Sequence, residues 1–212
     1  MSLAVIHGAA IAAFGRLAAH VKSFADEEGV PERVRQLAGL LKAQKKRLLE
    51  TPASTRADYH GAYPGGLLEQ MVETIEAGFS VSRVLFDGAI SAESILLVGV
   101  LHDIGKIGDE HRPYYVDAPD WKHRNGTFYE VSVDLVAMSV ADRSFQWAYR
   151  YGISLTPDEW QAIRYVNALH GPDACGRNDV AYRETKLLFV MATAKSFAVR
   201  KLKGWDDRTR AV

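Results

Sequence analysis

The segment LLVGVLHDIGK, residues 96–106, decides the fold. An apolar run, typical of a buried helix, leads directly into His102 and Asp103. Adjacent imidazole and carboxylate groups at the end of a rigid buried helix can hold a divalent cation, because each supplies a metal ligand from a fixed backbone position. Gly105 predicts a sharp turn after the helix. Lys106 follows three residues after Asp103 and can meet a phosphate drawn to that cation.

Helical periodicity extends on both sides of this segment. Ser91 and Thr156 are placed to cap two of the helices, and Glu159 completes a capping-box pattern with Thr156. No convincing run of alternating apolar and polar residues predicts a strand, so the predicted fold class is all-α. The predicted helical spans are about 3–24, 32–50, 67–86, 91–103, 131–141, 143–151, 157–170 and 181–203.

The composition is that of one sizeable domain. The chain has 212 residues, enough for a real core, with 26 basic and 26 acidic side chains and a formal net charge of zero. This balance excludes broad electrostatic capture of nucleic acid or of an anionic membrane. Basic clusters at 42–47 and 200–203 leave room for a local patch, but such clusters are more typical of solvated helix faces.

The number of cysteines and the pattern of the N-terminal segment indicate the cellular compartment. The single cysteine, Cys175, excludes an internal disulfide and a cysteine-based zinc site. The apolar residues 3–14 follow no basic region, and Arg16, His20 and Lys22 come soon after them. This pattern favours a buried amphipathic helix over a signal peptide or a membrane span. We therefore expect a soluble cytoplasmic protein without a membrane partner.

Residues 108–130 are irregular in pattern. They hold prolines and a glycine among several aromatic residues. A long irregular stretch inside a compact domain is often a lid or a binding loop. A surface segment without a binding role, held in place by buried aromatic side chains, explains the pattern equally well. The role of this stretch therefore stays open.

Four segments together resemble the HD-domain superfamily of metal-dependent phosphohydrolases. Residues 59–70, YHGAYPGGLLEQ, are similar to the opening of bacterial HD domains, and His102-Asp103 resembles the motif that names the family. Residues 163–171, IRYVNALHG, and 191–195, MATAK, resemble its later segments. The resemblance implies an HD-domain helical bundle over residues 51–212, with residues 1–50 as a helical extension packed on it.

The resemblance also implies a metal site, from which two ligands are missing. His102 and Asp103 match the family's ligands, but Gln70 stands where the family has its first histidine and Thr193 where it has its last aspartate. A glutamine offers only a neutral carbonyl oxygen and a threonine a weakly donating hydroxyl. The incomplete ligand set predicts at most a weakly held Mg²⁺ or Mn²⁺.

The remaining site residues follow from the same comparison. Asp103 and Lys106 are the candidate catalytic residues, and the binding pocket is expected to include Gln70, Thr193, His170 and His60. A rescue of the metal site by other side chains is an alternative that the sequence leaves open; the candidates are His60, His170, Asp109, Glu110 and His123. His102 and Asp103 can also be explained as a structural hydrogen-bonding pair between core helices.

Three functions compete. The favoured hypothesis is an HD-domain protein that keeps a phosphate-binding pocket, for a nucleotide or nucleic-acid end, but is impaired in hydrolysis. The second is an active metal-dependent phosphohydrolase acting on a nucleotide or phosphodiester. The third is a helical interaction protein that uses residues 3–50 as a partner or dimer surface. Gln70 and Thr193 favour the first hypothesis, because two losses at one site suggest that metal is no longer required.

Overall fold

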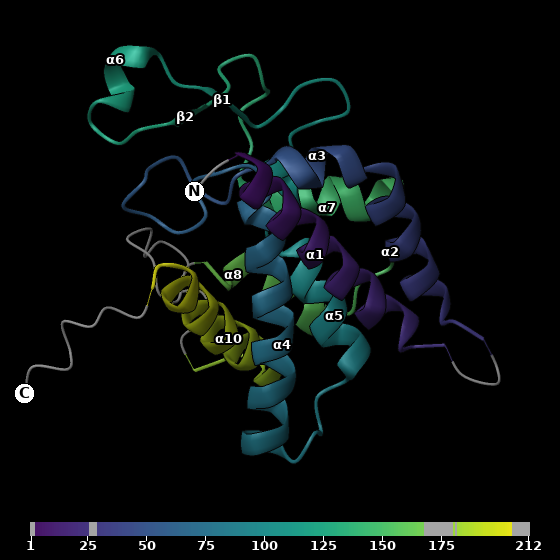
Figure 1. The fold of residues 1–212 in the computed structure, drawn as a ribbon. Coiled ribbons are helices and arrows are strands. Elements are labelled where there is room, and N and C mark those ends of the chain that lie inside the picture. Colours follow the sequence, from purple (N-terminus) through teal and green to yellow (C-terminus); the bar gives the residue numbers. More distant parts are fainter. Residues whose placement is uncertain (1–2, 26–28, 168–179, 181, 205–212) are drawn as a thin grey trace, which may run out of the picture.

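The chain folds into a bundle of helices with a small β arm at one end (Figure 1). The structure is a computed structural model, and it describes residues 3–25, 29–167, 180 and 182–204. The chain is mostly helical, as predicted. The described helices are α1 (Leu3–Lys22), α2 (Glu32–Ala43), α3 (Lys45–Glu50), α4 (Gly66–Phe86), α5 (Ala92–Leu101), α6 (Asp120–His123), α7 (Val140–Arg150), α8 (Pro157–Tyr165) and α10 (Lys186–Leu202).

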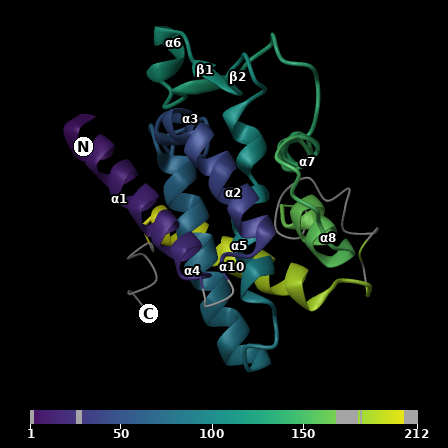
Figure 2. The ribbon, with the colours of Figure 1, turned by 90° about the vertical axis from the view of Figure 1, so that its right-hand side faces the viewer.

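Helices α4, α5 and α10 form the centre of the bundle, and α8 packs against α5 and α10 (Figure 2). Helix α5 is apolar on all sides, and every residue from Ile95 to Leu101 is buried. A helix of this kind is stable only when neighbours cover its whole circumference. The burial of α5 fixes the position of the segment that follows it, which contains His102 and Asp103.

Side-chain caps set the helix starts. Ser91 accepts a hydrogen bond from the backbone N–H of Ser94, and Thr156 and Glu159 form the predicted capping box. Helix α10 begins at Lys186 and not at 181, because the Thr185 hydroxyl caps it by accepting from the N–H of Leu188.

The N-terminal helices share one hydrophobic core with the rest of the bundle. Leu17 of α1, Leu37 of α2 and Leu48 of α3 are fully buried in the same cluster as the core residues of α4 and α5. The Arg33 guanidinium of α2 also donates to Glu93 at 2.9 Å and to the fully buried Glu159 at 2.7 Å. Helices α1, α2 and α3 are therefore packed against the bundle by apolar contacts, and α2 also by ionic contacts.

Further predicted spans differ from the structure. The span 157–170 is shorter, because α8 ends at Tyr165. The span 32–50 is two helices, because the chain bends at Gln44, which ends α2 and begins α3. The span 91–103 ends at Leu101 and gives way to a short 3-10 turn at Ile104–Ile107. The predicted helix 131–141 is wrong: residues 132–138 are irregular, and α7 begins only where the Ser139 hydroxyl accepts from the N–H of Asp142.

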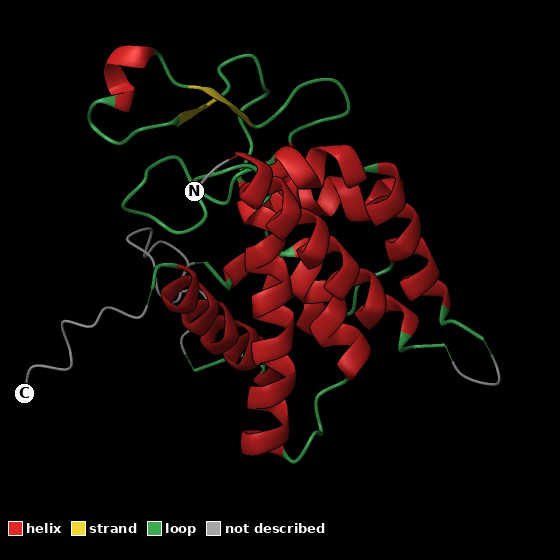
Figure 3. Ribbon diagram, viewed as in Figure 1, coloured by secondary structure: helices red, strands yellow, loops and turns green. Residues whose placement is uncertain are grey.

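The expectation of no strands is also wrong, in the irregular stretch 108–130. Strands β1 (Tyr115–Asp117) and β2 (Tyr129–Val131) pair antiparallel, with Val116 opposite Glu130. With the short helix α6 they form an arm beyond the helical bundle (Figure 3). The strands are only three residues long, too short for a period-2 pattern to be read from the sequence.

Among the described residues, no helix combines the length and the apolar character needed to cross a membrane.

Candidate functional site

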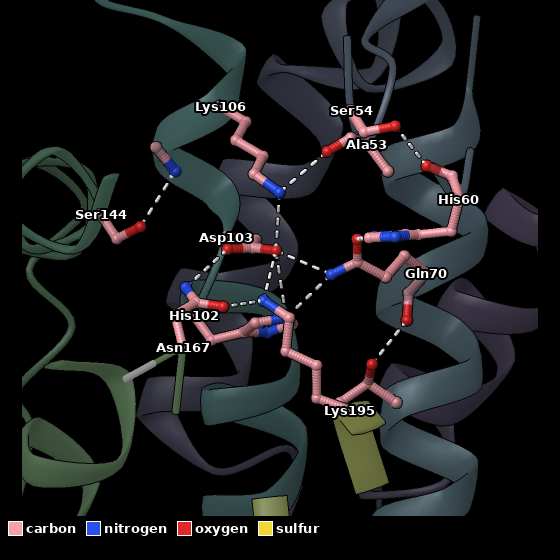
Figure 4. Close-up of polar contacts among 12 residues, drawn as sticks. Ala53, Ser54, His60, Gln70, His102, Asp103, Lys106, Ser144, Asn167 and Lys195 are labelled. Atoms are coloured by element: carbon pink, nitrogen blue, oxygen red, sulfur yellow. Dashed lines mark hydrogen bonds and ion pairs between the residues drawn. The ribbon is translucent and has the colours of Figure 1, made fainter. Parts of the chain in front are cut away.

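The Asp103 carboxylate lies at the centre of a buried polar cluster (Figure 4). Its side chain is fully buried. Its Oδ2 accepts from Gln70 Nε2 at 2.7 Å, from Lys195 Nζ at 2.7 Å and from Lys106 Nζ at 3.0 Å. Its Oδ1 accepts from Asn167 Nδ2 at 3.2 Å. Four side chains from four separate segments therefore donate to one carboxylate.

The turn after α5 places this carboxylate. His102 is the C-cap residue of α5, and Asp103, at φ −131°, leaves the helix. Gly105 is needed here for a close approach rather than for a sharp turn, because a Cβ at Gly105 would lie 2.2 Å from the carbonyl oxygen of Val140. The Gly105 N–H donates to Ser144 Oγ at 2.9 Å, which fastens the turn to α7.

The His102 ring is held in one tautomer. Its Nδ1 lies 2.9 Å from the carbonyl oxygen of Gly99, so Nδ1 carries the proton and donates. Its Nε2 lone pair faces the cluster, 3.3 Å from Gln70 Nε2 and 3.5 Å from Asp103 Oδ2. A metal-binding histidine is oriented in the same way, with one nitrogen fixed by a carbonyl and the other toward the ion.

His60 and Gln70 extend the cluster toward the loop before α4. His60 Nε2 donates to Gln70 Oε1 at 2.7 Å, since an amide oxygen only accepts. This leaves the Gln70 amide nitrogen free to donate to Asp103. The loop can reach this position because Gly66 has no side chain: a Cβ there would lie 2.1 Å from the carbonyl oxygen of Gly61.

Two ammonium groups share one carboxylate oxygen. Lys106 Nζ also donates to the carbonyl oxygen of Ala53 at 2.9 Å, and Lys195 Nζ donates to Asn167 Oδ1. The two lysine side chains are 14% and 11% exposed, so their ammonium groups are nearly but not wholly covered. Asn167 bridges Asp103 and Lys195, because its amide group both donates and accepts.

The charges in the cluster follow from burial and proximity. Burial raises the pKa of the Asp103 carboxyl, but Lys106 and Lys195 outweigh it and hold that pKa well below its usual value. Burial lowers the pKa of Lys195 to about 8, and Asp103 offsets part of that change. Burial and the neighbouring lysines lower the pKa of His60 to about 4 and that of His102 to about 3. At pH 7 the cluster thus holds two cations, one anion and two neutral imidazoles.

The predicted site residues are brought together only in part. His60, Gln70, His102, Asp103 and Lys106 meet in the cluster. Thr193, expected beside Asp103, takes no part in the hydrogen bonds found among the described residues, and Lys195 of the same helix supplies the contact. The two positions are about 200° apart around α10, so their side chains leave the helix on different faces. His170 lies outside the described residues.

Of the alternative metal ligands, His60 lies in the cluster, whereas Asp109, Glu110 and His123 lie outside it. Asp109 forms an ion pair with Arg112, and Glu110 forms one with Arg150. His123 packs its ring against Phe128 in the β arm, with 5.7 Å between ring centroids. Among the described residues, no group of three or more His, Cys, Asp or Glu side chains is arranged to hold a metal ion.

Sequence reasoning missed Lys195 and Asn167, although both stand in segments that carry the family resemblance. Helical spacing could have revealed Lys195, because it follows the buried Leu188 and Met191 by seven and four residues and so shares their face. A lysine in the middle of an apolar stripe predicts a buried counterion. Asn167 gives no such signal, since it follows the end of α8.

Comparisons with known protein families, with curated proteins and with solved structures gave no match.

The two neutral histidines make stability depend on pH. Their folded pKa values, about 4 for His60 and about 3 for His102, lie below the value of about 6.5 expected in the unfolded chain. As the pH falls below 6.5, protons bind the unfolded chain first, so stability is full above 6.5 and is lost down to about pH 4. The loss should steepen as the pH falls and approach about 1.4 kcal/mol per pH unit for each histidine below pH 6, measured by urea unfolding between pH 7 and 5.

His60→Gln should remove about half of this pH dependence, whereas His123→Gln, on the arm, should leave it unchanged. A wild-type stability that stays constant from pH 7 to 5 would contradict the neutral state of both rings.

Proposed function

We propose that this chain is an HD-fold protein that binds a phosphorylated small molecule or a nucleic-acid end without hydrolysing it, and that the Lys195 ammonium group stands in place of the catalytic metal ion. One observation carries the proposal: Lys195 and Lys106 both place Nζ within 3.0 Å of the same oxygen of Asp103. The order of segments around His102-Asp103, and the metal-type orientation of the His102 ring, support the HD-fold part.

The donor set does not fit a divalent cation. Oδ2 of Asp103 already accepts from three nitrogen donors, two of them positively charged. A metal ion at this oxygen would meet two ammonium groups, and like charges in a buried setting repel strongly. Gln70 turns its amide nitrogen, not its oxygen, toward the carboxylate, so it offers no ligand atom there. These contacts support a protein that has given up metal-dependent hydrolysis.

The same contacts favour an anionic ligand. The cluster has a surplus of one positive charge at pH 7, because His60 and His102 are neutral. An ammonium group has three N–H donors, and the bonds found among the described residues use two on Lys106 and two on Lys195. One donor on each lysine is left for a further acceptor. A phosphate group supplies several acceptor oxygens and the negative charge that balances the surplus.

Inorganic phosphate should therefore raise the melting temperature of the wild-type protein, and Mn²⁺ should not. At a hundred times its dissociation constant, a ligand adds about 2.7 kcal/mol, or about 5 to 10 °C for a chain of this size. Lys106→Met should abolish the phosphate effect. The matched control is Lys122→Met, which removes an equal charge from an ion pair with Glu130 on the arm and should keep the effect.

Activity decides between this proposal and the active phosphohydrolase. The assay follows hydrolysis of bis(p-nitrophenyl) phosphate with Mn²⁺ and Mg²⁺. No metal-dependent turnover is expected. Metal-dependent turnover that is lost in Asp103→Asn would overturn the proposal in favour of an enzyme, whereas absence of any phosphate effect would favour the interaction protein.

A further inference from the structure

A groove lined by basic side chains lies at the end of the bundle that carries the arm. His7 of α1, Lys42 of α2, and Lys45 and Lys46 of α3 line this basic groove, which has a volume of about 520 Å³. Ion pairs of lysine among the described residues involve Lys106, Lys122, Lys195 and Lys201, and so none of the lysines of the groove. The charge of the basic groove is opposed within its lining only by Glu50.

An aromatic cavity of about 920 Å³ adjoins the basic groove. It lies between the β arm and the loop that precedes α4. Its walls include Tyr59 and Tyr63 from the loop and Phe128 and Tyr129 from the arm. Tyr59 is 53% exposed and Phe128 is 37% exposed, so both rings present surface to a ligand.

Pro64 lines both hollows, so they lie next to each other at this residue. A path from the basic groove to the aromatic cavity therefore leads from α2 and α3, past Pro64, to the arm. Figure 1 shows α3 and the arm at the same end of the bundle. Lys203 adds a further cation at the wall of the aromatic cavity, where Asp58 is already paired with Arg56. The cations of the basic groove therefore lie next to two exposed aromatic rings, those of Tyr59 and Phe128.

We propose that this path binds single-stranded nucleic acid, with backbone phosphates on the lysines of the basic groove and unstacked bases against the rings of the aromatic cavity. Single-strand sites combine these two features, because phosphates need cations and every exposed base has a face that can stack. A duplex keeps its bases stacked inside, so it would use only the lysines. Asp117, at the cavity wall, can accept from the exocyclic amino group of a base.

This inference goes beyond the proposed function, because it uses none of the side chains around Asp103. It also agrees with a net charge of zero: the basic groove is a local feature, and it favours one strand in one place rather than general capture of polyanions. An acidic protein segment is the competing partner. It would need the lysines but gain little from the four aromatic rings.

Fluorescence anisotropy with a labelled oligothymidylate tests the proposal on the full chain. Tyr59→Ala should weaken binding about 5- to 100-fold, the range measured for loss of one base stack. Lys42→Ala with Lys46→Ala should also weaken it, and should lower the slope of log K against log salt by about 0.7 for each lysine. The matched control, Lys22→Ala with Arg83→Ala, removes the same charge from exposed sites on α1 and α4 and should bind like wild type.

Three results would overturn the proposal. The first is binding that Tyr59→Ala leaves unchanged, and the second is a duplex of the same length that binds as tightly as the single strand. The third is displacement of the oligonucleotide by polyglutamate at equal charge concentration, which would assign the path to an acidic protein. Lys106→Met, which should abolish the phosphate effect, is expected to bind the single strand normally, so the two proposals can fail separately.

Discussion

Replacing Asp103 with asparagine is expected to lower the free energy of unfolding by about 3 to 5 kcal/mol, the usual cost of removing one partner from a buried ion pair. The change keeps the shape of the side chain but leaves Lys106 and Lys195 without their shared counterion. Urea unfolding at pH 7 measures the effect. The melting temperature should fall by about 10 °C or more.

A double-mutant cycle identifies the cause. Lys195→Met removes one of the two ammonium groups, so Asp103→Asn should cost less in that background than in the wild type. Asp117→Asn, at an exposed carboxylate on β1, serves as the control and should change stability by less than about 0.5 kcal/mol. If Asp103→Asn costs no more than this control, the carboxylate is not the counterion that balances the cluster.

Introducing metal ligands into the cluster is expected to produce the second large effect. Gln70→His with Lys195→Asp replaces an amide and an ammonium group by an imidazole and a carboxylate, next to the Nε2 lone pair of His102. We expect Mn²⁺ to raise the melting temperature of this double variant by about 5 to 10 °C at a hundred times its dissociation constant. Each single change should give far less, because the ligands of one ion act as a unit.

A second double variant tests which position on α10 must carry the new carboxylate. Gln70→His with Thr193→Asp puts the same groups on α10 but about 200° away from Lys195, so it should show no Mn²⁺ effect. Lys195→Glu in place of Lys195→Asp checks the reach of the shorter side chain. A metal-dependent shift seen only with Thr193→Asp would mean that Thr193, and not Lys195, occupies the family's ligand position. Without metal, the Lys195→Asp variant should be less stable than wild type, because two carboxylates then face each other.

The sequence predicts the central helices well because their signals are local. Helix α4 follows its apolar period, α5 is apolar on all sides, and the caps at Ser91 and Thr156 are read from single residues. The sequence does not predict the arm, because its strands are short. They are stabilised by pairing with each other, and a local sequence pattern does not reveal pairing between distant segments. The end of the helix at Leu101 depends on the Asp103 backbone angle, which the apolar run does not reveal.

The sequence motifs predict most of the residues around Asp103, but not the residue that reaches it from α10. His102, Asp103, Lys106, Gln70 and His60 converge, but the contact from α10 comes from Lys195. The resemblance to HD domains points to Thr193 as the α10 residue beside Asp103, whereas the contact in the structure comes from Lys195. Helix geometry decides otherwise, because the residue on the buried face is the one that reaches the carboxylate.

The position of Lys195 on α10 determines where the positive charge beside Asp103 comes from. A metal ion is acquired from solution, and the fraction of sites that hold it depends on its concentration, on competing chelators and on pH. The Lys195 amine is carried by the chain itself, so it is part of every molecule from synthesis onward, and at pH 7 most of these amines hold their proton. The packing of α10 against α4 places this amine beside Asp103. The carboxylate therefore receives its counterion through folding alone. No metal ion has to be loaded for this charge to be present, and neither starvation for metal nor a chelator can remove it.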